Sequence, residues 1–331
     1  MSSVEQAAAE QPQSKSPAWE VKAAKQSRLA FGLAVGELAR RDEKVAAISA
    51  DTIDLFGLRP FLEASPERLI EAGIAEQNAM GIAAGMATTG MRPIICGYAP
   101  FITTRSLEQL RNDVAYANQR VVIGGACSGI VLAMSGGTHH AVEDIAIMRN
   151  MPNMTVIAPC DARQTWQAAL ATEQLDGPCY LRLGGKFDEP DVTELDADFR
   201  IGKADQLRDG NDVTVIACGA LVAPALAAAE ALAHDGIGVR VINMHTIKPL
   251  DRDAVLKAAA ETGAIVTAEE HRVTGGLGGA VAELLAVELP TRMRMIGMPD
   301  EFAIIGPTAR VREHYGMDQN AISDACHELT K

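Results

Sequence analysis

The chain has 331 residues, of which 48% are hydrophobic, 22% are charged and only 4% are aromatic. This length is enough for two domains, each with a core of its own. The formal net charge of −13 argues against nucleic acid and anionic membranes as partners.

The cysteines and the N-terminal segment point to a cytoplasmic protein. We expect reduced, mostly buried thiols, because no two cysteines form a C-x-x-C pair or another metal-like spacing; they are Cys96, Cys127, Cys160, Cys179, Cys218 and Cys326. Residues 1–18 read as a disordered polar tail without the features of a secretory signal. The longest apolar stretch, Val213–Ala233, is interrupted by Gly219, Pro224 and Glu230, so it predicts a strand, a turn and a helix and no membrane span.

In residues 19–185, short β-rich runs alternate with Ala-rich helical runs. Strands are predicted at Val45–Ser49, Pro93–Cys96, Val121–Gly124, Thr155–Ala158 and Cys179–Leu183. Helices are predicted at Lys25–Arg40, Ala75–Thr88, Ser106–Ala117 and Ala162–Thr172. This alternation predicts a mostly parallel sheet with helices on both faces.

Residues 186–200 are acidic and turn-rich, so they are predicted to be a linker. The alternation then resumes in residues 201–331. The expected elements are strands at Val213–Ala217, Val239–Asn243 and Ala264–Ala268, and helices at Ala223–His234, Asp251–Thr262 and Leu277–Val287. The predicted fold class is therefore α/β, with two domains that each hold a mostly parallel sheet between helices.

The segment Gly73–Gly85, GIAEQNAMGIAAG, begins a helix of small apolar residues with a glutamate. A glutamate in the first turn often does no more than interact favourably with the helix dipole. Here Gly81 and Gly85 share one face and permit close helix packing, and the helix looks buried nearly all round. Since glutamate is rarely buried without a partner, Glu76 is predicted to have a specific one.

Two aromatic side chains, Tyr98 and Phe101, follow the strand predicted at Pro93–Cys96. Core filling is one explanation for such rings. Ligands also collect at the carboxyl ends of strands in open parallel sheets, where a flat ring can stack on a flat ligand.

A glycine loop with a histidine pair lies at Ser135–Asp144. His139 and His140 are adjacent, but no third ligand follows at a recognisable spacing, so no metal site is predicted on this chain. A histidine in a glycine loop suits proton transfer to or from a substrate oxygen.

Together, and in this order, the three segments resemble the pyrimidine-binding and C-terminal domains of the transketolase family. The strings GIAEQNAMGIAAGMA, FITTRSLEQLR and GGTHHAVEDIAIMR are similar to the family's glutamate segment, aromatic segment and glycine–histidine loop. The later strings MPNMTVIAPCDA, DVTVIACGALV and EEHRVTGGLGGAVAE extend the resemblance over roughly residues 20–331.

The resemblance implies a thiamine-diphosphate-dependent transketolase, which moves a two-carbon ketol unit from a ketose donor to an aldose acceptor. It implies that Glu76 hydrogen-bonds a ring nitrogen of the cofactor's aminopyrimidine and favours the tautomer that activates the cofactor. The remaining cofactor contacts implied are Phe101, Tyr98, Asp51 and Arg105. His139 is implied as a second catalytic residue, in contact with sugar hydroxyls.

The sequence departs from the family pattern at positions that contact the sugar in the family. The family loop usually reads GEDGPTH, and here it reads AMSGGTH, with Ser135 in place of an aspartate associated with donor recognition. Cys127 occupies the position of a substrate-contacting histidine. The arginine expected to clamp a sugar phosphate has no clear match, since Arg182 comes too early and Lys186 just beyond. Losing a bidentate arginine weakens phosphate recognition, so we expect an unusual ketose donor or acceptor, contacted by His139, Ser135 and Lys186.

No GDG string occurs in the sequence. The resemblance therefore implies a second polypeptide, an N-terminal transketolase subunit that carries this motif and holds the diphosphate with Mg²⁺ or Ca²⁺. The expected assembly is α2β2, with sugars as substrates and two sites at subunit interfaces.

Three other interpretations stay open. They are the beta subunit of a 2-oxo acid dehydrogenase, 1-deoxyxylulose-5-phosphate-synthase-like chemistry, and a non-catalytic transketolase-like partner. The presence of Glu76 with Phe101 argues against the last, because a decayed site has no reason to keep a carboxylate that is costly to bury.

Overall fold

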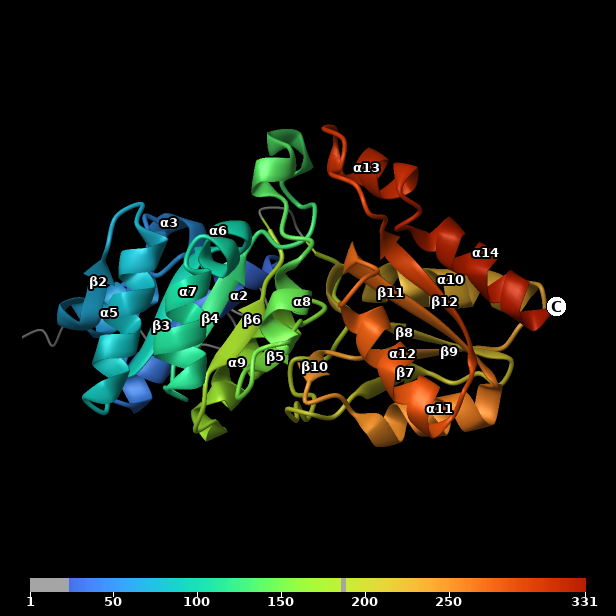
Figure 1. The fold of residues 1–331 in the computed structure, drawn as a ribbon, viewed down its shortest axis with the longest axis horizontal. Coiled ribbons are helices and arrows are strands. Elements are labelled where there is room, and N and C mark those ends of the chain that lie inside the picture. Colours follow the sequence, from blue (N-terminus) through green and yellow to red (C-terminus); the bar gives the residue numbers. More distant parts are fainter. Residues whose placement is uncertain (1–23, 186–188) are drawn as a thin grey trace, which may run out of the picture.

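The structure is a computed structural model that describes residues 24–185 and 189–331. Two sheets flanked by helices lie side by side (Figure 1). The predicted tail at 1–18, Lys186 and the first part of the predicted linker lie outside the described residues.

The first sheet is built mainly from the N-terminal half of the chain. Its strands are β1 (Val45–Ser49), β2 (Leu69–Glu71), β3 (Arg92–Tyr98), β4 (Val122–Ala126), β5 (Thr155–Ile157), β6 (Cys179–Arg182) and β10 (Thr246–Lys248). Their order is β10-β5-β6-β4-β3-β1-β2, and all neighbours are parallel except β10, which runs antiparallel to β5.

Helices cover both faces of this sheet. They are α2 (Ser27–Arg41), α3 (Ile53–Phe56), α4 (Arg59–Ala64), α5 (Glu76–Thr88), α6 (Ala99–Thr104), α7 (Leu107–Gln109), a π-helical segment (Leu110–Tyr116), α8 (Asp144–Arg149) and α9 (Ala162–Ala171). Successive residues of β3 serve opposite cores: Ile94 packs with Phe31 of α2, and Ile95 packs with Met80 of α5. Because strand side chains alternate, a strand buried on both faces must be apolar throughout.

The second sheet has five strands in the order β12-β11-β8-β9-β7, parallel except for β7. The strands are β7 (Asp205–Arg208), β8 (Val213–Ala217), β9 (Val239–Asn243), β11 (Ala264–Arg272) and β12 (Arg292–Met298). The helices are α10 (Val222–His234), α11 (Arg252–Thr262), α12 (Leu277–Glu288), α13 (Thr308–His314) and α14 (Gln319–Thr330). The predicted fold class is confirmed.

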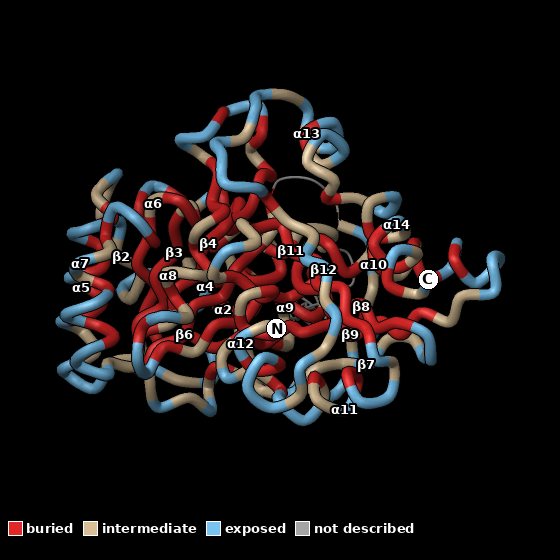
Figure 2. Tube along the Cα trace, turned by 45° about the vertical axis from the view of Figure 1, so that its right-hand side comes forward, coloured by how far each residue is buried: buried red, intermediate tan, exposed pale blue. Residues whose placement is uncertain are grey.

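The two domains share more than a linker. Strand β10 belongs to the second domain along the chain but pairs with β5 of the first sheet. Lys248 at its end donates hydrogen bonds to the carbonyl oxygens of Arg149, at 3.0 Å, and Met151. One buried apolar cluster also runs from the first domain into the second. Figure 2 shows buried residues continuing through both sheets.

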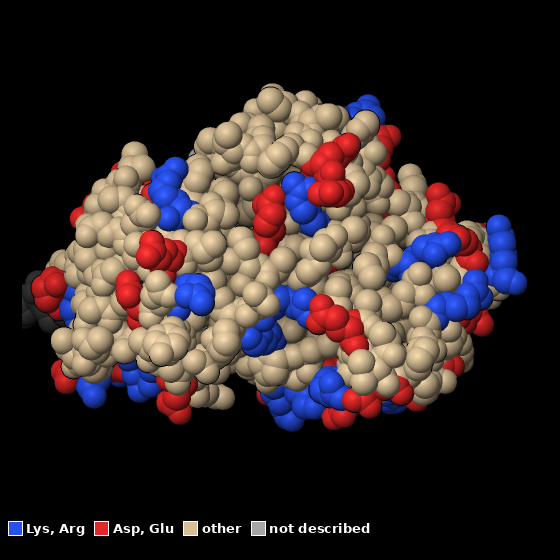
Figure 3. Space-filling model, viewed as in Figure 1, with Lys and Arg blue, Asp and Glu red and all other residues tan. Residues whose placement is uncertain are grey.

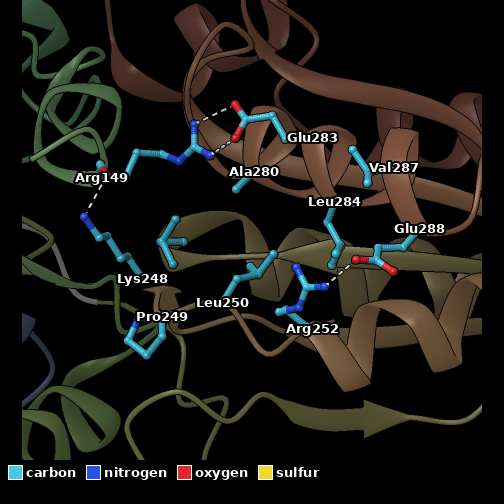
Figure 4. Close-up of a pocket in the computed structure, with 11 residues that line it drawn as sticks. Arg149, Lys248, Pro249, Leu250, Arg252, Ala280, Glu283, Leu284, Val287 and Glu288 are labelled. Atoms are coloured by element: carbon cyan, nitrogen blue, oxygen red, sulfur yellow. Dashed lines mark hydrogen bonds and ion pairs between the residues drawn. The ribbon is translucent and has the colours of Figure 1, made fainter. Parts of the chain in front are cut away.

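A cleft of about 500 Å³ opens beside β10, between the domains (Figure 4). Two ion pairs line it: Arg149 with Glu283, with Nη1 and Oε1 3.0 Å apart, and Arg252 with Glu288 at 2.7 Å. Its lining contains none of the predicted site residues. Acidic and basic side chains are mixed over the face drawn in Figure 3.

All six cysteine side chains are buried, as predicted, and none of them forms a disulfide. Within the described part of the chain, no helix combines the length and apolar character needed to cross a membrane.

Candidate functional site

The candidate site lies along one edge of the first sheet, where the parallel strands β1 to β4 end. Asp51 follows β1, Glu76 follows β2, Phe101 follows β3, and the loop with His139 follows β4. Adjacent parallel strands therefore bring together residues that are far apart in sequence, as is usual for ligand sites in such sheets.

Glu76 is the first residue of α5 and is almost fully buried, with only 4% of its side chain exposed. Its Oε2 lies 2.7 Å from Nη1 of Arg105, so within this chain the carboxylate has a charged partner, which the sequence did not name. The Arg105 side chain is 47% exposed. The carboxylate is therefore held inside the protein by a cation that reaches in from the surface.

Helix α5 differs from expectation on its outer face. The helix was predicted to be buried nearly all round, and this is wrong for the chain by itself: Gly81 and Gly85 are exposed, and a Cβ atom built at either would meet no atom within 4 Å. The small residues needed for close packing are present, but no helix of the described chain covers them.

Three rings follow one another from the end of β3 to the glycine loop. The ring centroids of Tyr98 and Phe101 lie 6.0 Å apart, and those of Phe101 and His139 lie 5.2 Å apart, both edge-to-face. The Arg105 guanidinium lies 4.6 Å from the Phe101 centroid. The structure thus joins Glu76, Arg105 and the three rings into one group.

The two adjacent histidines have different surroundings. His139 is half-buried beside Phe101, and its Nδ1 lies 3.0 Å from the Thr138 hydroxyl. His140 is buried, and no side chain of the described residues hydrogen-bonds its ring. Burial lowers the pKa of His140. His139 is therefore the histidine that a ligand can reach.

Asp51 is tied to the site through a residue that sequence reasoning missed. Asp51 has a positive φ of 58°, and its backbone N–H donates to Glu71 Oε1 at 2.7 Å. The same oxygen accepts from the N–H of Gly73 at 2.9 Å, three residues before Glu76. Glu71 thereby holds two loops of the site in register. Its only sequence signal is its place at the end of a strand.

Of the predicted substrate contacts, Ser135 is exposed on the glycine loop and lines a cavity of about 640 Å³ together with Met134 and Arg312. Lys186 lies outside the described residues. In residues 24–185 and 189–331, no cluster of three or more His, Cys, Asp or Glu could hold a metal ion.

The Arg182 side chain is buried in the protein interior. Its Nε lies 2.8 Å from Oδ2 of Asp144, and its Nη2 donates to the carbonyl oxygens of Ala141 and Glu270 at 2.9 Å each. The Tyr180 hydroxyl also donates to Asp144, at 2.7 Å. Arg182 therefore anchors the exit of the histidine loop to the second domain and does not reach the site surface. Sequence reasoning did not find Asp144.

A buried carboxylate, a row of rings and an accessible histidine at the strand ends define an α/β protein with a candidate site for a flat cofactor. Comparison with known proteins makes this more specific. Residues 23–185 match the family model of the transketolase pyrimidine binding domain, and residues 202–322 match that of the transketolase C-terminal domain. The chain belongs to the transketolase family, and the resemblance drawn from its motifs is confirmed.

Curated relatives include two separate subunits of nearly the same extent. The chain is 42% identical over 296 residues to one subunit of the apulose-4-phosphate transketolase from Phocaeicola vulgatus, covering 89% of this chain and 94% of the relative. It is 42% identical over 295 residues to the 6-deoxy-6-sulfo-D-fructose transketolase subunit SqwH from Clostridium sp., covering 89% and 91%. A 1-deoxy-D-xylulose-5-phosphate synthase 1 from Geobacter sulfurreducens is 41% identical over 299 residues, but these span only 46% of that protein.

Among solved structures, a split gene transketolase described as an inactive beta4 tetramer superimposes with a TM-score of 0.86 at 38% identity. The match covers 93% of this chain and 99% of that one. Transketolase from Campylobacter jejuni shares the fold, with a TM-score of 0.76 at 19% identity over 92% of this chain. Agreement over nearly full length with separate subunits identifies a transketolase subunit that acts with a partner subunit.

Proposed function

We propose that Glu76 holds the aminopyrimidine of thiamine diphosphate, and that this chain transfers a two-carbon ketol unit when a separate diphosphate-binding subunit completes the site. The observation that carries this proposal is the buried Glu76 carboxylate beside the Phe101 and His139 rings. A carboxylate in a dry pocket is suited to share a proton with a ring nitrogen, because a hydrogen bond to the ring offsets the cost of burial.

The cofactor, when bound, supplies the carbon nucleophile and the electron sink. The chain's own residues hold it and exclude water. Glu76 would share a proton between its carboxylate and the ring nitrogen, Phe101 and Tyr98 offer ring surfaces to the flat pyrimidine, and Asp51 lies at the loop that Glu71 fixes. His139, at the open end of the row, exchanges a proton with a sugar oxygen.

Before the cofactor binds, the ion pair with Arg105 offsets part of the cost of burying the Glu76 carboxylate. Its guanidinium pairs with the carboxylate but remains half-exposed, so it can release the carboxylate without leaving the Phe101 ring. The pyrimidine would then replace one hydrogen-bond partner of Glu76 by another, while Arg105 stays over the Phe101 ring as a contact to the cofactor.

The diphosphate and its Mg²⁺ or Ca²⁺ are assigned to the diphosphate-binding subunit, which carries the GDG motif, in an α2β2 assembly. Two features support a missing neighbour on this side of the molecule. The outer face of α5 is open at Gly81 and Gly85, and Ile74, two residues before Glu76, is exposed. Small residues on an exposed helix face allow another chain to approach the Glu76 helix closely.

The donor sugar is proposed to be an unusual ketose. Arg182 is buried against Asp144, so an acidic group of the donor would have to be held by another residue than in transketolases with the usual arginine. Two relatives are named for apulose 4-phosphate and 6-deoxy-6-sulfo-D-fructose. We therefore expect a donor of this kind to be preferred over xylulose 5-phosphate, with Ser135 and Lys186 as contacts.

The test uses the complex purified with its own diphosphate-binding subunit. Donor cleavage is measured with apulose 4-phosphate, 6-deoxy-6-sulfo-D-fructose, xylulose 5-phosphate and, for 2-oxo acid chemistry, pyruvate. Glu76→Gln should lower kcat at least about 100-fold with assembly intact, and the exposed control Glu230→Gln should have no effect. Turnover by Glu76→Gln within a few-fold of the wild type, or pyruvate as the best donor, would contradict the proposal.

A further inference from the structure

Four large apolar side chains lie exposed around the glycine–histidine loop. Phe302 and Ile305 are 81% and 68% exposed, and Met134 and Ile304 are exposed beside them. We call these four residues the apolar ledge. Met134 comes from the loop after β4, and the other three come from the segment between β12 and α13. Figure 3 shows an area without charged side chains at the top of the molecule, where this loop lies in Figure 1, with charged side chains to its right where α13 lies.

The ledge lies directly on the two glycines of the loop. A Cβ atom at Gly136 would come within 3.1 Å of Ile305 Cδ1, and one at Gly137 within 3.7 Å of Phe302 Cδ1. Only glycine lets the second domain approach the loop this closely at Gly136, which also has a positive φ of 81°. The second domain thereby contributes to the wall of the candidate site.

The backbone beneath the ledge is fixed. Arg272 Nη1 donates to the carbonyl oxygens of Pro299 and Glu301 at 2.9 Å each, and the backbone N–H of Ile304 donates to the Tyr315 hydroxyl at 3.0 Å. The exposed rings and methyl groups are thus presented in a set arrangement. A preorganised apolar surface of this kind is typical of a binding face.

The charges near the ledge and its apolar side chains favour a protein surface over a sugar as its binding partner. The Arg272 guanidinium lies 5.6 Å from the Phe302 centroid and is already paired with Glu143, with Nε and Oε1 3.2 Å apart. Arg272 is therefore not free to bind a sugar phosphate. Polyhydroxylated sugars also gain little from a row of hydrocarbon side chains, whereas a protein surface gains much.

The ledge is continuous with the candidate cofactor site. The short turn that begins at Gly137 ends at His139, whose ring contacts Phe101. We propose that the apolar ledge is a docking surface for the diphosphate-binding subunit, so that this partner contacts the second domain as well as the Glu76 helix. The inference rests on the proposed function, because it takes the partner from there.

The test compares Phe302→Ser combined with Ile305→Ser against a matched control, Val287→Ser, which alters a side chain 81% exposed on α12. Sedimentation velocity measures the Kd for the diphosphate-binding subunit, after circular dichroism confirms that each variant is folded. We expect the ledge variant to bind at least tenfold more weakly and the control to stay within twofold of the wild type.

Two results would overturn the inference. One is a ledge variant whose Kd stays within twofold of the wild type. The other is a ledge variant that loses only the self-association of the isolated chain, which would assign the ledge to a second copy. Failure of the proposed function gives a different result, because the wild-type chain would then neither assemble with the partner nor turn over a ketose.

Discussion

The Glu76 carboxylate and the Arg105 guanidinium form one ion pair across a steep change in exposure: Oε2 and Nη1 are 2.7 Å apart, yet the two side chains are 4% and 47% exposed. Removing Arg105 leaves a buried carboxylate without its charged partner. Arg105→Ala should therefore destabilise the cofactor-free chain by about 1–3 kcal/mol. Urea unfolding of the isolated chain measures this.

A double-mutant cycle provides the control for this pair. In Glu76→Gln the burial cost of the charge is gone, so Arg105→Ala in that background should cost less than in the wild type. Equal costs in both backgrounds would show that Arg105 stabilises the chain through its packing on Phe101 and not through Glu76.

Features that are determined by neighbouring residues in the sequence were predicted, and features that depend on contacts between distant segments were not. Local patterns predicted the strands at Val45–Ser49, Val213–Ala217 and Val239–Asn243 with the observed boundaries. Strand β10 was missed, because its three residues carry no pattern of their own and it pairs with a distant strand. Glu76 was correctly predicted to need a partner, but naming Arg105 requires knowing which loops meet at the sheet edge.

Burial was the property that sequence predicted least well. The small apolar residues of α5 predict a helix that is packed on every side, but a pattern cannot say which chain does the packing, and the face at Gly81 is open. Arg182 was set aside as a phosphate clamp because it comes too early in the chain, but nothing in the sequence predicted its burial. The structure buries it against Asp144, a contact between residues 38 positions apart.

The Arg182–Asp144 pair should be a major determinant of stability. Both side chains are buried, and Arg182 also satisfies two carbonyl oxygens that otherwise lack this donor. Asp144→Asn or Arg182→Leu should each destabilise the chain by about 3–5 kcal/mol, because one partner is left charged or unpaired in the interior. The exposed pair Arg310–Glu313 is the control, and Arg310→Ala should cost less than about 1 kcal/mol in the same denaturation experiment.

Lys248 ties β10 to the first domain through two carbonyl oxygens, those of Arg149 and Met151. Lys248→Met keeps most of the side-chain volume and removes both hydrogen bonds. It should lower the free energy of unfolding by about 1–3 kcal/mol. The exposed Lys257→Met on α11 should change it by less than about 0.5 kcal/mol. Similar values for the two variants would mean that the carbonyl contacts contribute nothing.

Glu189 should make stability depend on pH between its two pKa values. Burial raises its pKa from 4.5 to about 7, although its Oε2 accepts from the backbone N–H of Ser27 at 3.1 Å and from the Ser27 hydroxyl. Because the folded state binds this proton more tightly than the unfolded state, the stabilisation is complete below about pH 4.5 and is lost as pH rises to about 7.

As the pH rises from about 4.5 to above 7, ionisation of Glu189 should lower the free energy of unfolding by an amount on the order of 3 kcal/mol. Asp205, whose pKa burial raises to about 6, acts in the same direction, so the wild-type slope contains both groups. Glu189→Gln isolates one of them, because it cannot ionise and still accepts from Ser27. Urea midpoints at pH 5 and pH 8 should differ less for Glu189→Gln than for the wild type, while the exposed Glu194→Gln should keep the full difference. A wild-type slope retained by Glu189→Gln would mean that Glu189 binds its proton equally well in the folded and unfolded chain.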